Sequence, residues 1–498
     1  MLEIAGTARW RQPFIWIALL TIALALVGLG WRGLWEPDEG RYTNVALHML
    51  ASGDWLDPHR HPDVGHWTKP PLTYWVLAAS MAVFGHTVFA ARLPSALAYL
   101  LLVWMAARIA RRLVPGGEQV AALVYATMLL PFASGQLITT DPFLAASQAV
   151  AMAGYVAARF EPRAARRGML QMWAGFALAF LTKGPPGLLP LLAVLAYEGM
   201  QPRRDSLRQL LAPSGILLFA LVALPWYVVA VIRHPGLLEY FLGQEVVARV
   251  ASDDFGRNGQ WYGWIKVYLP TLLLGSLPWT PWLWGWLRDL PGQWRSWRRD
   301  ASARAQDPAL LLALWVSLPL LVFCLARSRL PLYLLPLFLP LALLVARQRL
   351  AAGRPLPQGG WIALWALALM GLKLTAARLD TGRDAAAWAR AIQARAPVAI
   401  SEVNALDDAP RYGLHLALGV PVEQIALAST PSKSRFNPPY DQTLAEDLRE
   451  PQQDQIWYTP QSHLPAVQAA LERQGWQAEV LGAPYHGRVI FRVRPRQE

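Results

Sequence analysis

Two adjacent carboxylates, Asp38 and Glu39, stand in the segment Glu36-Pro37-Asp38-Glu39-Gly40-Arg41-Tyr42. Carboxylates of this kind are able to take part in acid–base chemistry. A proline followed by acidic residues is also a common start of a helix, so the ordinary interpretation is a capping pair. Because Arg41 follows at once and more cations belong to the same group of connections, we treat this segment as a candidate site.

The cations in question stand in short breaks between apolar stretches. Lysine is scarce in this chain, yet Lys69 precedes two prolines and Lys183 precedes Gly-Pro-Pro. Arg327 and Arg329 share another short turn, and Arg249 lies in the long connection 234–261. A single such residue usually anchors a helix end. Several of them at one membrane boundary instead predict an anionic ligand, most simply a lipid phosphate.

A second polar cluster follows in the same connection. Histidines and carboxylates at this density are able to bind a divalent metal. Their spacing matches no zinc pattern, and Pro58 and Pro62 keep the segment irregular. We therefore expect a solvated loop, and a divalent metal ion as cofactor is the alternative. The residues of the cluster are Asp57, His59, His61, Asp63 and His66, with the three histidines as the weak metal candidates.

The composition determines the kind of element that must position these residues. Of 498 residues, 54% are hydrophobic and only 16% are charged, and the mean hydropathy is +0.26. This excludes a disordered chain and nearly excludes a soluble enzyme. The net charge of +13 comes from short clusters between apolar stretches, so nucleic-acid binding is not expected. The single cysteine, Cys324, forms no intrachain disulfide.

Eleven stretches are candidate membrane spans, since a spanning helix needs about 20 mostly apolar residues. We predict an all-α polytopic membrane protein with about 11–13 transmembrane helices, and an interfacial helix at 71–85. The candidate spans are residues 14–34, 88–107, 120–133, 144–158, 169–181, 187–200, 210–232, 264–287, 310–326, 333–346 and 361–377.

Arginine clusters fall in alternate connections, which predicts their side of the membrane. By the positive-inside rule these connections are cytoplasmic, so the N-terminus lies inside and the tail from about Leu379 lies outside. The clusters are Arg9 and Arg11; Arg108, Arg111 and Arg112; Arg159, Arg163, Arg166 and Arg167; Arg203, Arg204 and Arg208; Arg288, Arg295, Arg298 and Arg299; and Arg347, Arg349 and Arg354.

The expected domains are a membrane domain, residues 1–378, and a soluble extracytoplasmic α/β domain, residues 379–498. The membrane domain has two long outer loops, 35–87 and 233–262, and the second is either an ordinary surface loop or a lid. The tail alternates short apolar runs with helical patterns. We expect strands at 398–400, 455–458 and 489–493, and helices at 384–394 and 463–474.

In these motifs the chain resembles the GT-C glycosyltransferases that use a polyprenyl-phosphate sugar, in particular the bacterial aminoarabinose (lipid A) transferase and protein O-mannosyltransferase-like families. The resemblance rests on Pro37-Asp38-Glu39-Gly40-Arg41-Tyr42 and Met49 to Trp55, on Lys69-Pro70-Pro71 with Tyr74-Trp75, on Thr182-Lys183-Gly184, and on Arg329-Leu330-Pro331-Leu332-Tyr333. Two positions depart from these families: Thr68 stands where a glutamate is common, and Gly40 where a larger residue is usual.

The resemblance implies a membrane glycosyltransferase of the bacterial inner membrane, with a periplasmic C-terminal domain. It would move a sugar from an undecaprenyl-type phosphate to a lipid A-type glycolipid, a polysaccharide or a protein. Asp38 would be the catalytic carboxylate that orients or deprotonates the acceptor. Lys69 and Lys183 would bind the lipid phosphate. The other implied substrate-binding residues are Glu39, Arg41, Tyr74, Arg249, Arg329 and Tyr333.

Two other classes of membrane protein remain open from the sequence. A transporter or flippase of lipid-linked sugars would place its charges near the middle of the spans and often shows inverted repeats. A lipid-linked glycan ligase would act on a polymer rather than on a single sugar. Charges that cluster at one boundary, without an evident repeat, favour glycosyl transfer over both.

Overall fold

The computed structural model describes residues 3–201, 209–248, 257–305, 307–354, 356–396, 399–429, 434–450, 452 and 454–496. The chain divides into two compact units, each assembled from two stretches of sequence. The first unit contains Met1–Val27 and Leu93–Lys373, and the second contains Gly28–Arg92 and Leu374–Glu498. The first long connection therefore belongs to the same unit as the tail.

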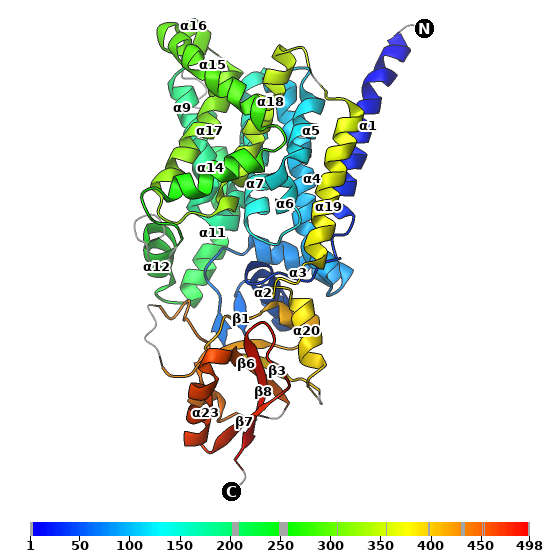
Figure 1. Ribbon diagram of the computed structural model, residues 1–498. Helices are drawn as coiled ribbons and strands as arrows, with labels where there is room; N and C mark the ends of the chain where they lie inside the picture. The colour runs from blue at the N-terminus through cyan, green and yellow to red at the C-terminus, as the bar shows by residue number, and fades with distance from the viewer. Residues whose placement is uncertain are drawn as a thin grey trace. The chain divides into compact units, whose positions relative to one another are not determined.

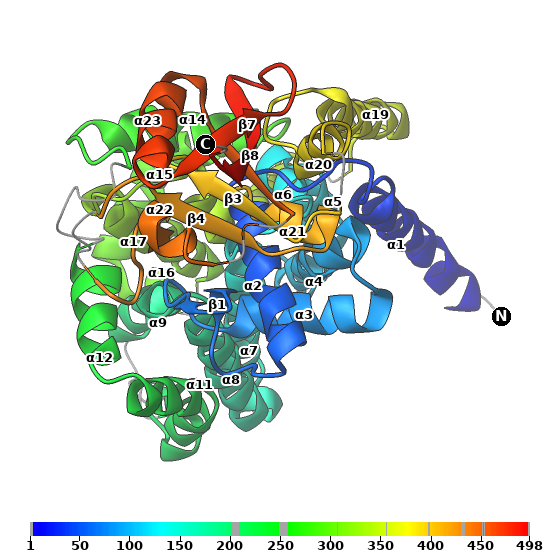
Figure 2. The same ribbon diagram turned by 90° about the horizontal axis from the view of Figure 1, so that it is seen from below.

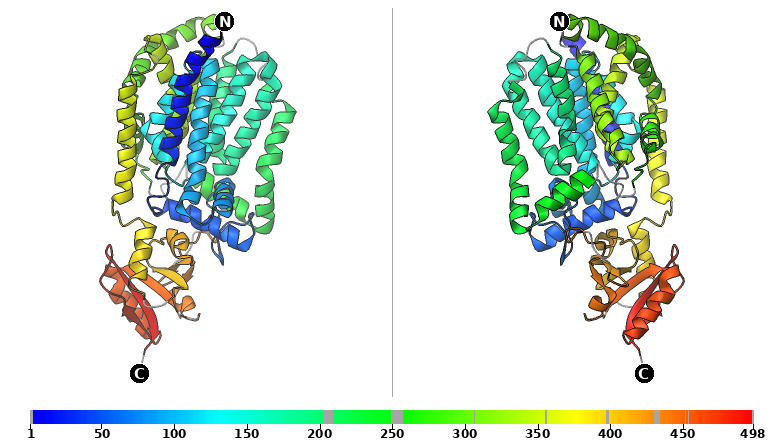
Figure 3. Two further views of the ribbon diagram at one scale, coloured as in Figure 1. Left: turned by 90° about the vertical axis from the view of Figure 1, so that its right-hand side faces the viewer. Right: turned by 90° about the vertical axis from the view of Figure 1, so that its left-hand side faces the viewer.

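Helices make up the first unit, and its long helices run side by side (Figures 1 and 3). Two of them, α4 and α19, continue into the second unit. The elements are α1 (Glu3–Leu26), α4 (Val88–Leu113), α5 (Glu118–Thr127), α6 (Leu129–Ser134), α7 (Asp141–Phe160), η1 (Pro162–Ala164), α8 (Ala165–Lys183), η2 (Pro185–Leu188), α9 (Leu189–Gly199), α11 (Pro213–Arg233), α12 (Leu237–Tyr240), η3 (Phe241–Ala248), α14 (Gly263–Gly275), α15 (Thr280–Arg299), α16 (Ala301–Arg304), α17 (Pro308–Leu325), η4 (Pro331–Leu337), α18 (Phe338–Ala351) and α19 (Gly359–Arg378).

Within the described residues, six helical segments are long and apolar enough to cross a membrane. They are Val88–Leu113, Asp141–Phe160, Pro213–Arg233, Pro308–Leu325, Pro331–Ala351 and Gly359–Arg378. These segments, together with the shorter apolar helices, confirm the prediction of a mostly helical membrane protein. A spanning segment of about 20 apolar residues satisfies its own backbone hydrogen bonds as a helix, which is why such sequences form helices in lipid.

Two predicted spans are each divided between two α-helices, and the predicted span 14–34 extends beyond α1, which ends at Leu26. The stretch 264–287 is interrupted between α14 and α15, where Pro278 supplies no backbone N–H to continue a helix. The stretch 120–133 is divided between α5 and α6, because Met128 has an extended backbone, with ψ at 135°. Apolar composition alone predicted one helix in each case, and the local backbone divides it.

Helices α7 and α8 pack closely because glycines line their contact. A Cβ on Gly154 would lie 2.5 Å from the backbone nitrogen of Met172, and a Cβ on Gly175 would meet the backbone of Ala151. Glycine removes this obstacle and lets two backbones approach. The close packing brings the last residue of α8, Lys183, to the first residue of α7, Asp141.

A six-stranded sheet forms the centre of the second unit, in the order β5-β4-β3-β6-β8-β7. Strands β4, β3, β8 and β7 of this sheet are labelled in Figure 2. Strands β5, β4, β3 and β6 are parallel, and β8 is antiparallel to both β6 and β7. The elements of the unit are α2 (Asp38–Ser52), β1 (His59–His61), β2 (Val64–Gly65), α3 (Leu72–Phe84), α20 (Ala385–Gln393), β3 (Glu402–Leu406), α21 (Gly413–Leu418), β4 (Val422–Ala426), β5 (Gln442–Thr443), α22 (Leu444–Asp447), β6 (Gln455–Pro460), η5 (Gln461–His463), α23 (Leu464–Arg473), β7 (Trp476–Val480) and β8 (Arg488–Pro495).

Apolar clusters cover both faces of this sheet. On one face Trp388 of α20 and Leu414 of α21 pack against Val403 and Ile456. On the other face Leu444 of α22 and Leu471 of α23 belong to a second cluster with Trp457 and Phe491 of the sheet. Alternation of side chains along a strand sends residues to both faces, and helices on each face then bury them.

The predicted α/β character of the tail is confirmed. Helices α20 and α23 and strands β6 and β8 lie where the patterns predicted them. The predicted strand at 398–400 includes Val398, which lies outside the described residues, and β3 begins only at Glu402. Strands β4, β5 and β7 and helices α21 and α22 were not predicted, because they are short and weakly patterned.

Candidate active site

Helix α2 starts at Asp38 and carries the first candidate residues. Pro37 precedes it, and both acids of the pair lie in its first turn, where carboxylates stabilise a helix start. The Asp38 side chain is 51% exposed, and Arg41 Nη2 donates to Asp38 Oδ1 over 2.5 Å. The helix ends at Gly53, whose φ of 72° suits glycine. Asp38 is thus an accessible carboxylate on a well-defined helix.

Glu39 has the opposite environment, since its side chain is only 3% exposed. Arg32 Nη1 lies 2.6 Å from Glu39 Oε2, and Arg92 donates from Nε to Oε1 and from Nη2 to Oε2, both over 2.9 Å. Trp35 N also donates to Oε2. Burial disfavours the charged form, but the two guanidinium groups outweigh it and lower the pKa of Glu39 to about 2. Both of its oxygens are therefore engaged by protein groups.

The position of Gly40 has no room for a side chain. A Cβ here would meet the carboxylate of Glu36 and would lie 2.5 Å from the backbone nitrogen of Gly413. Gly413 N donates to Glu36 Oε1 over 2.5 Å. Burial raises the pKa of Glu36 to about 8, against the opposing effect of this hydrogen bond. The contact accounts for the departure noted at Gly40.

Lys69 and Tyr74 lie in the second unit as well, at the start of α3. Lys69 is half-buried, and its Nζ donates to the carbonyl of Thr68. Tyr74 is fully buried, and the centre of its ring lies 5.8 Å from that of Tyr42 and 6.1 Å from that of His66. The predicted helix at 71–85 is confirmed as α3.

His66 shows that several of these cations gather in one region. It is 2% exposed, and its Nε2 lies 2.9 Å from Thr68 Oγ1. Burial and the positive charges of Arg41, Arg60 and Lys69 lower the pKa of His66 well below its ordinary value. Arg41 and Lys69 therefore act on the same buried imidazole, and His66 is neutral at physiological pH.

In the first unit, the ammonium of Lys183 is held at the end of α8. Its Nζ lies 2.5 Å from Asp141 Oδ1 and 4.2 Å from the centre of the Tyr333 ring. Both partners of the ion pair are largely buried, with side chains 11% and 8% exposed. The Tyr333 hydroxyl accepts a hydrogen bond from Arg257 Nη1. The structure thus brings Lys183 and Tyr333 together, and adds Asp141 to them.

Arg329 is 4% exposed and binds backbone carbonyls. Its Nη1 donates to the carbonyls of Asn258 and Gln260, both over 2.7 Å, and its Nη2 donates to that of Cys324. These contacts fix residues 258–260 next to the turn after α17. Arg327, by contrast, is exposed, and Arg249 lies outside the described residues.

The histidine-rich segment is ordered, and the expectation of a solvated loop is wrong for its central residues. Residues 59–65 form the hairpin β1–β2. Arg60 is 5% exposed, and its Nη2 lies 2.7 Å from Asp441 Oδ1. His59 contacts Asp57, with 3.1 Å between Nε2 and Oδ1. The polar spacing did not reveal Asp441 as the partner of Arg60, because Asp441 comes from the tail, 381 residues later.

Three further groups of functional interest were missed by sequence reasoning. Asp141 opens α7 and is the partner of Lys183. Arg32 and Arg92 hold Glu39. A signal for Asp141 existed, since Thr139-Thr140-Asp141-Pro142 is an acidic helix start at the end of an apolar span. For Arg92, the signal was an arginine at the end of a span that the arginine pattern predicts to be the outer one, against the positive-inside trend.

Comparison with known proteins shows what the chain is similar to. Residues 68–228 match the sequence profile described as dolichyl-phosphate-mannose-protein mannosyltransferase, a segment that includes Lys69, Asp141 and Lys183. The chain is similar to the undecaprenyl phosphate-alpha-4-amino-4-deoxy-L-arabinose arabinosyl transferase of Pseudomonas aeruginosa strain LESB58, with 36% identity over 374 residues, 71% of this chain and 64% of that protein. It is also 36% identical to transferase 2 of that name from Sodalis glossinidius, over 69% of this chain and 60% of the relative.

These alignments span about 60% of the length of the curated relatives. Among solved structures, the fold is similar to that of ArnT from Cupriavidus metallidurans bound to undecaprenyl phosphate, with a TM-score of 0.75, 21% identity, and coverage of 96% of this chain and 97% of that one. It is also similar to the archaeal oligosaccharyltransferase AglB from Archaeoglobus fulgidus, with a TM-score of 0.52 and 12% identity over 99% of this chain and 75% of that one. These likenesses confirm the GT-C fold that the sequence motifs predicted.

Proposed function

This chain is a membrane protein of the GT-C fold with sequence relatives among the undecaprenyl phosphate-aminoarabinose transferases, and on that premise we propose that it is a polyprenyl-phosphate-sugar-dependent glycosyltransferase. The observation that carries the proposal is the difference between two neighbouring acids. The Glu39 carboxylate is buried in ion pairs with Arg32 and Arg92, whereas the Asp38 carboxylate, on the same helix, is exposed.

In this proposal Asp38 orients the acceptor and, where the acceptor is a hydroxyl, removes its proton. The acceptor oxygen forms a bond to the anomeric carbon of the sugar, and the bond from that carbon to the lipid phosphate oxygen breaks. The leaving phosphate keeps the electron pair, and the hydroxyl proton passes to Asp38. A positioned carboxylate of this kind is worth about 10²–10⁴ in rate. Asp38 is the first residue of α2. The ion pairs of the next residue, Glu39, with Arg32 and Arg92 hold this end of the helix in place.

Lys69 and Lys183 would stabilise the phosphate as its negative charge grows. Lys183 is supported by its fixed position, since Asp141 and the ring of Tyr333 hold the ammonium in a largely buried place. Lys69 is supported by its neighbourhood, in which Arg41 and Arg60 also raise the positive potential around His66. Arg329 would act indirectly, because its guanidinium holds backbone carbonyls of residues 258–260.

The relatives' names point to the donor, undecaprenyl phosphate carrying 4-amino-4-deoxy-L-arabinose. We propose that this chain uses an undecaprenyl-type donor in the bacterial inner membrane. The acceptor would be a lipid A-type glycolipid, with a polysaccharide or a protein as the other classes to test. The alternating arginine clusters support an orientation with the second unit on the periplasmic side.

Direct transfer tests the proposal. The purified chain in lipid nanodiscs is supplied with undecaprenyl phosphate-aminoarabinose or with undecaprenyl phosphate-mannose, and with lipid A or a hydroxyl-bearing glycan as acceptor. Mass spectrometry of the acceptor then measures a gain of one sugar. We expect transfer from an undecaprenyl-phosphate donor to at least one acceptor, with release of undecaprenyl phosphate. Movement of the lipid-linked sugar across the bilayer without any transfer would support the flippase alternative instead.

A further inference from the structure

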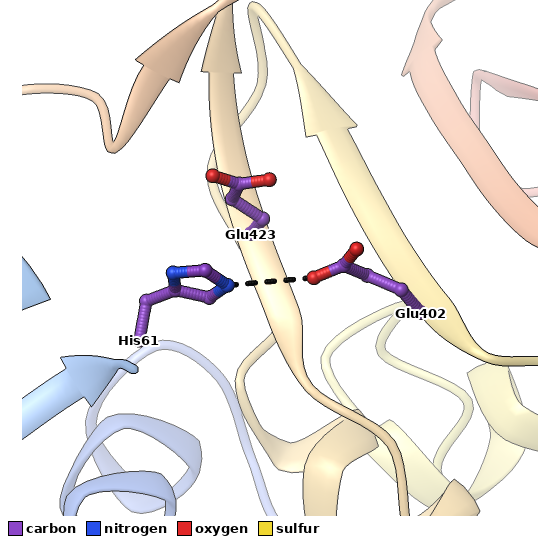
Figure 4. Close-up of side chains that lie close together, drawn as sticks. All are labelled: His61, Glu402 and Glu423. Atoms are coloured by element: carbon purple, nitrogen blue, oxygen red, sulfur yellow. Dashed lines mark hydrogen bonds and ion pairs between the residues drawn. The ribbon is translucent and has the colours of Figure 1, made fainter. Parts of the chain in front are cut away.

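Three side chains from distant parts of the sequence converge in the second unit. One ligand-type atom each from His61, Glu402 and Glu423 lies within 4.8 Å of the others. His61 comes from β1, Glu402 from the start of β3 and Glu423 from β4 (Figure 4). The imidazole points toward Glu402, with 3.4 Å between Nε2 and Oε1.

The sheet register explains why the two glutamates meet. Strands β3 and β4 are parallel, and Asn404 is paired with Glu423. Residues two apart along a strand share a face, so Glu402 lies on the same face as Asn404 and therefore on the face of Glu423. Arg60 holds the hairpin β1–β2 near these strands, because its guanidinium lies 2.7 Å from the carboxylate of Asp441, which directly precedes β5. His61 is the next residue along the hairpin.

The cluster combines two carboxyl groups and one imidazole in a largely buried place. Glu423 is 3% exposed, and the side chains of His61 and Glu402 are 13% and 15% exposed. The charged groups that act on Glu423 are His61, Glu402 and Asp447. Two carboxyl groups therefore share one imidazole. A buried carboxylate is costly unless it is paired, coordinates a metal or takes up a proton, so a divalent cation would stabilise both groups in their ionised form.

The amide side chains of two glutamines donate hydrogen bonds to the two glutamates. Gln455 Nε2 donates to Glu402 Oε2 over 3.3 Å, and Gln442 Nε2 donates to Glu423 Oε2 over 3.0 Å. Each amide thus fixes one oxygen of its carboxylate, while Oε1 of Glu402 faces His61. Hydrogen bonds of this type orient the carboxylates that ligate metal ions.

A second observation points to an unfilled polar position. Asn404 is fully buried, and its amide nitrogen donates to Gln455 Oε1. Among the residues that the structure describes, no donor reaches its oxygen Oδ1. A buried carbonyl oxygen without a partner loses the hydrogen bond that it has in water, and a cation or its water shell would restore one. Asn404 is two residues from Glu402 on the same strand and is paired with Glu423 on the next strand, so its side chain lies on the face of the sheet that carries both glutamates.

We propose that His61, Glu402 and Glu423 bind a divalent cation, with Zn²⁺ as the best match to one imidazole and two carboxylates. Zinc bonds of about 2.0–2.2 Å in a tetrahedral arrangement place ligand atoms about 3.4 Å apart. The separation between His61 and Glu402 already has this value. Glu423 would turn its carboxylate toward them, and water would complete the coordination. The ion would fasten β1 to the sheet, independently of the proposed transfer reaction.

Metal counting tests this site on the intact chain. The protein is purified in nanodiscs with a tag free of histidine, treated with EDTA, equilibrated with Zn²⁺ and dialysed, and its zinc content is measured by mass spectrometry. We expect about one zinc per chain, and a rise of the melting temperature on adding Zn²⁺. Glu402→Gln and His61→Ala should each weaken Zn²⁺ binding by at least tenfold and remove the shift in melting temperature.

His59→Ala is the matched control, because His59 lies on the same hairpin and contacts Asp57 rather than the glutamates. It should keep the full zinc content. Glu402→Gln preserves side-chain size, so the metal-free protein should elute and melt like the metal-free wild type. Absence of bound zinc in the wild type, or unchanged affinity in both variants, would overturn the proposal. Equal loss of zinc in His59→Ala would also overturn it, by moving the site elsewhere on the hairpin.

Discussion

The ammonium of Lys183 and the carboxylate of Asp141 lie 2.5 Å apart, at the end of α8 and at the start of α7. Glycines in the contact between these helices allow this approach. The Tyr333 ring faces the same ammonium, 4.2 Å from its centre. A lysine held in this way is prepositioned for an anion and loses little side-chain freedom on binding it.

Removing the Lys183 charge should weaken binding of the lipid phosphate. Lys183→Met deletes one partner of a charged hydrogen bond, which costs about 1.5–3 kcal/mol, or roughly tenfold to 150-fold in affinity for undecaprenyl phosphate. Binding is measured by titration of the purified chain in nanodiscs. Lys373→Met is the control, since Lys373 also lies in a helix of the first unit and its Nζ lies 3.5 Å from the carbonyl oxygen of Leu24. Equal affinity in wild type and Lys183→Met would return Lys183 to a structural role.

A methyl group at Gly40 should destabilise the second unit. The Cβ of Gly40→Ala would displace the Glu36 carboxylate and press on Gly413, and overpacking of this kind costs about 1–3 kcal/mol. Thermal unfolding of the purified chain measures the loss. Gly371→Ala should unfold at or slightly above the wild-type temperature, because among the described residues the added Cβ meets nothing within 4 Å beyond its own stretch of helix. A stable Gly40→Ala would show that Glu36 has room to move.

His48 and His415 should make the protein less stable in acid. Their rings lie 4.9 Å apart, and burial followed by their mutual repulsion lowers the pKa of His48 to about 3, while burial lowers that of His415 to about 4. The folded state keeps both rings neutral, whereas the unfolded chain binds protons below about pH 6.5. Stability is therefore unaffected above pH 6.5 and falls as pH decreases, by about 2 kcal/mol for His48 at pH 5.

His48→Gln removes one of these groups and should flatten the fall in melting temperature between pH 7 and pH 5. His463→Gln changes an exposed histidine and should follow the wild-type curve. If the wild type melts at the same temperature at pH 7 and pH 5, the two rings are not held neutral in the fold.

The arginine pattern makes a prediction about orientation. Alkaline phosphatase, active only outside the cytoplasm, is fused after Glu498 and compared with a fusion in the connection that holds Arg163 and Arg166. We expect activity from the first fusion alone, because alternate connections carry the arginine clusters. Activity from the second fusion and none from the first would invert the topology and the assignment of the site.

Patterns of neighbouring residues predicted much of the fold. Long apolar runs gave the spanning helices, and Pro37 with two acids marked the start of α2. Contacts between distant segments were not predictable in this way. The ion pair of Arg60 with Asp441 and the hydrogen bond from Gly413 to Glu36 each join the first connection to the tail, and the two segments belong to one unit.

In the candidate site too, the residue types were predictable from the sequence, whereas contacts with other elements were not. Residue type and spacing singled out Asp38, Lys69 and Lys183, but not that Glu39 is bound on both oxygens by arginines from two other elements. The sequence placed Asp38 and Glu39 in one motif, with Asp38 as the implied catalytic carboxylate and Glu39 as an implied substrate-binding residue. The structure separates them, because a rotation of about 100° along the helix turns one toward solvent and the next into the protein.

This separation predicts different consequences for two conservative changes. Glu39→Gln breaks a buried pair with Arg32 and Arg92 and should cost about 3–5 kcal/mol of stability. Asp38→Asn removes a half-exposed charge paired with Arg41, and the exposed pair is worth at most about 1 kcal/mol. Calorimetry or thermal melting of the two variants in parallel checks this order, and equal melting temperatures would contradict it.

Sugar transfer by Asp38→Asn tests the central claim most directly. The rate of transfer from undecaprenyl phosphate-linked sugar is compared among wild type, Asp38→Asn and the control Asp54→Asn, whose side chain caps a turn at Leu56 and keeps an accepting oxygen. We predict that Asp38→Asn melts near the wild-type temperature and transfers sugar about 10²–10⁴-fold more slowly, while Asp54→Asn transfers at the wild-type rate. A folded Asp38→Asn protein that transfers sugar as fast as the wild type would contradict the proposed mechanism.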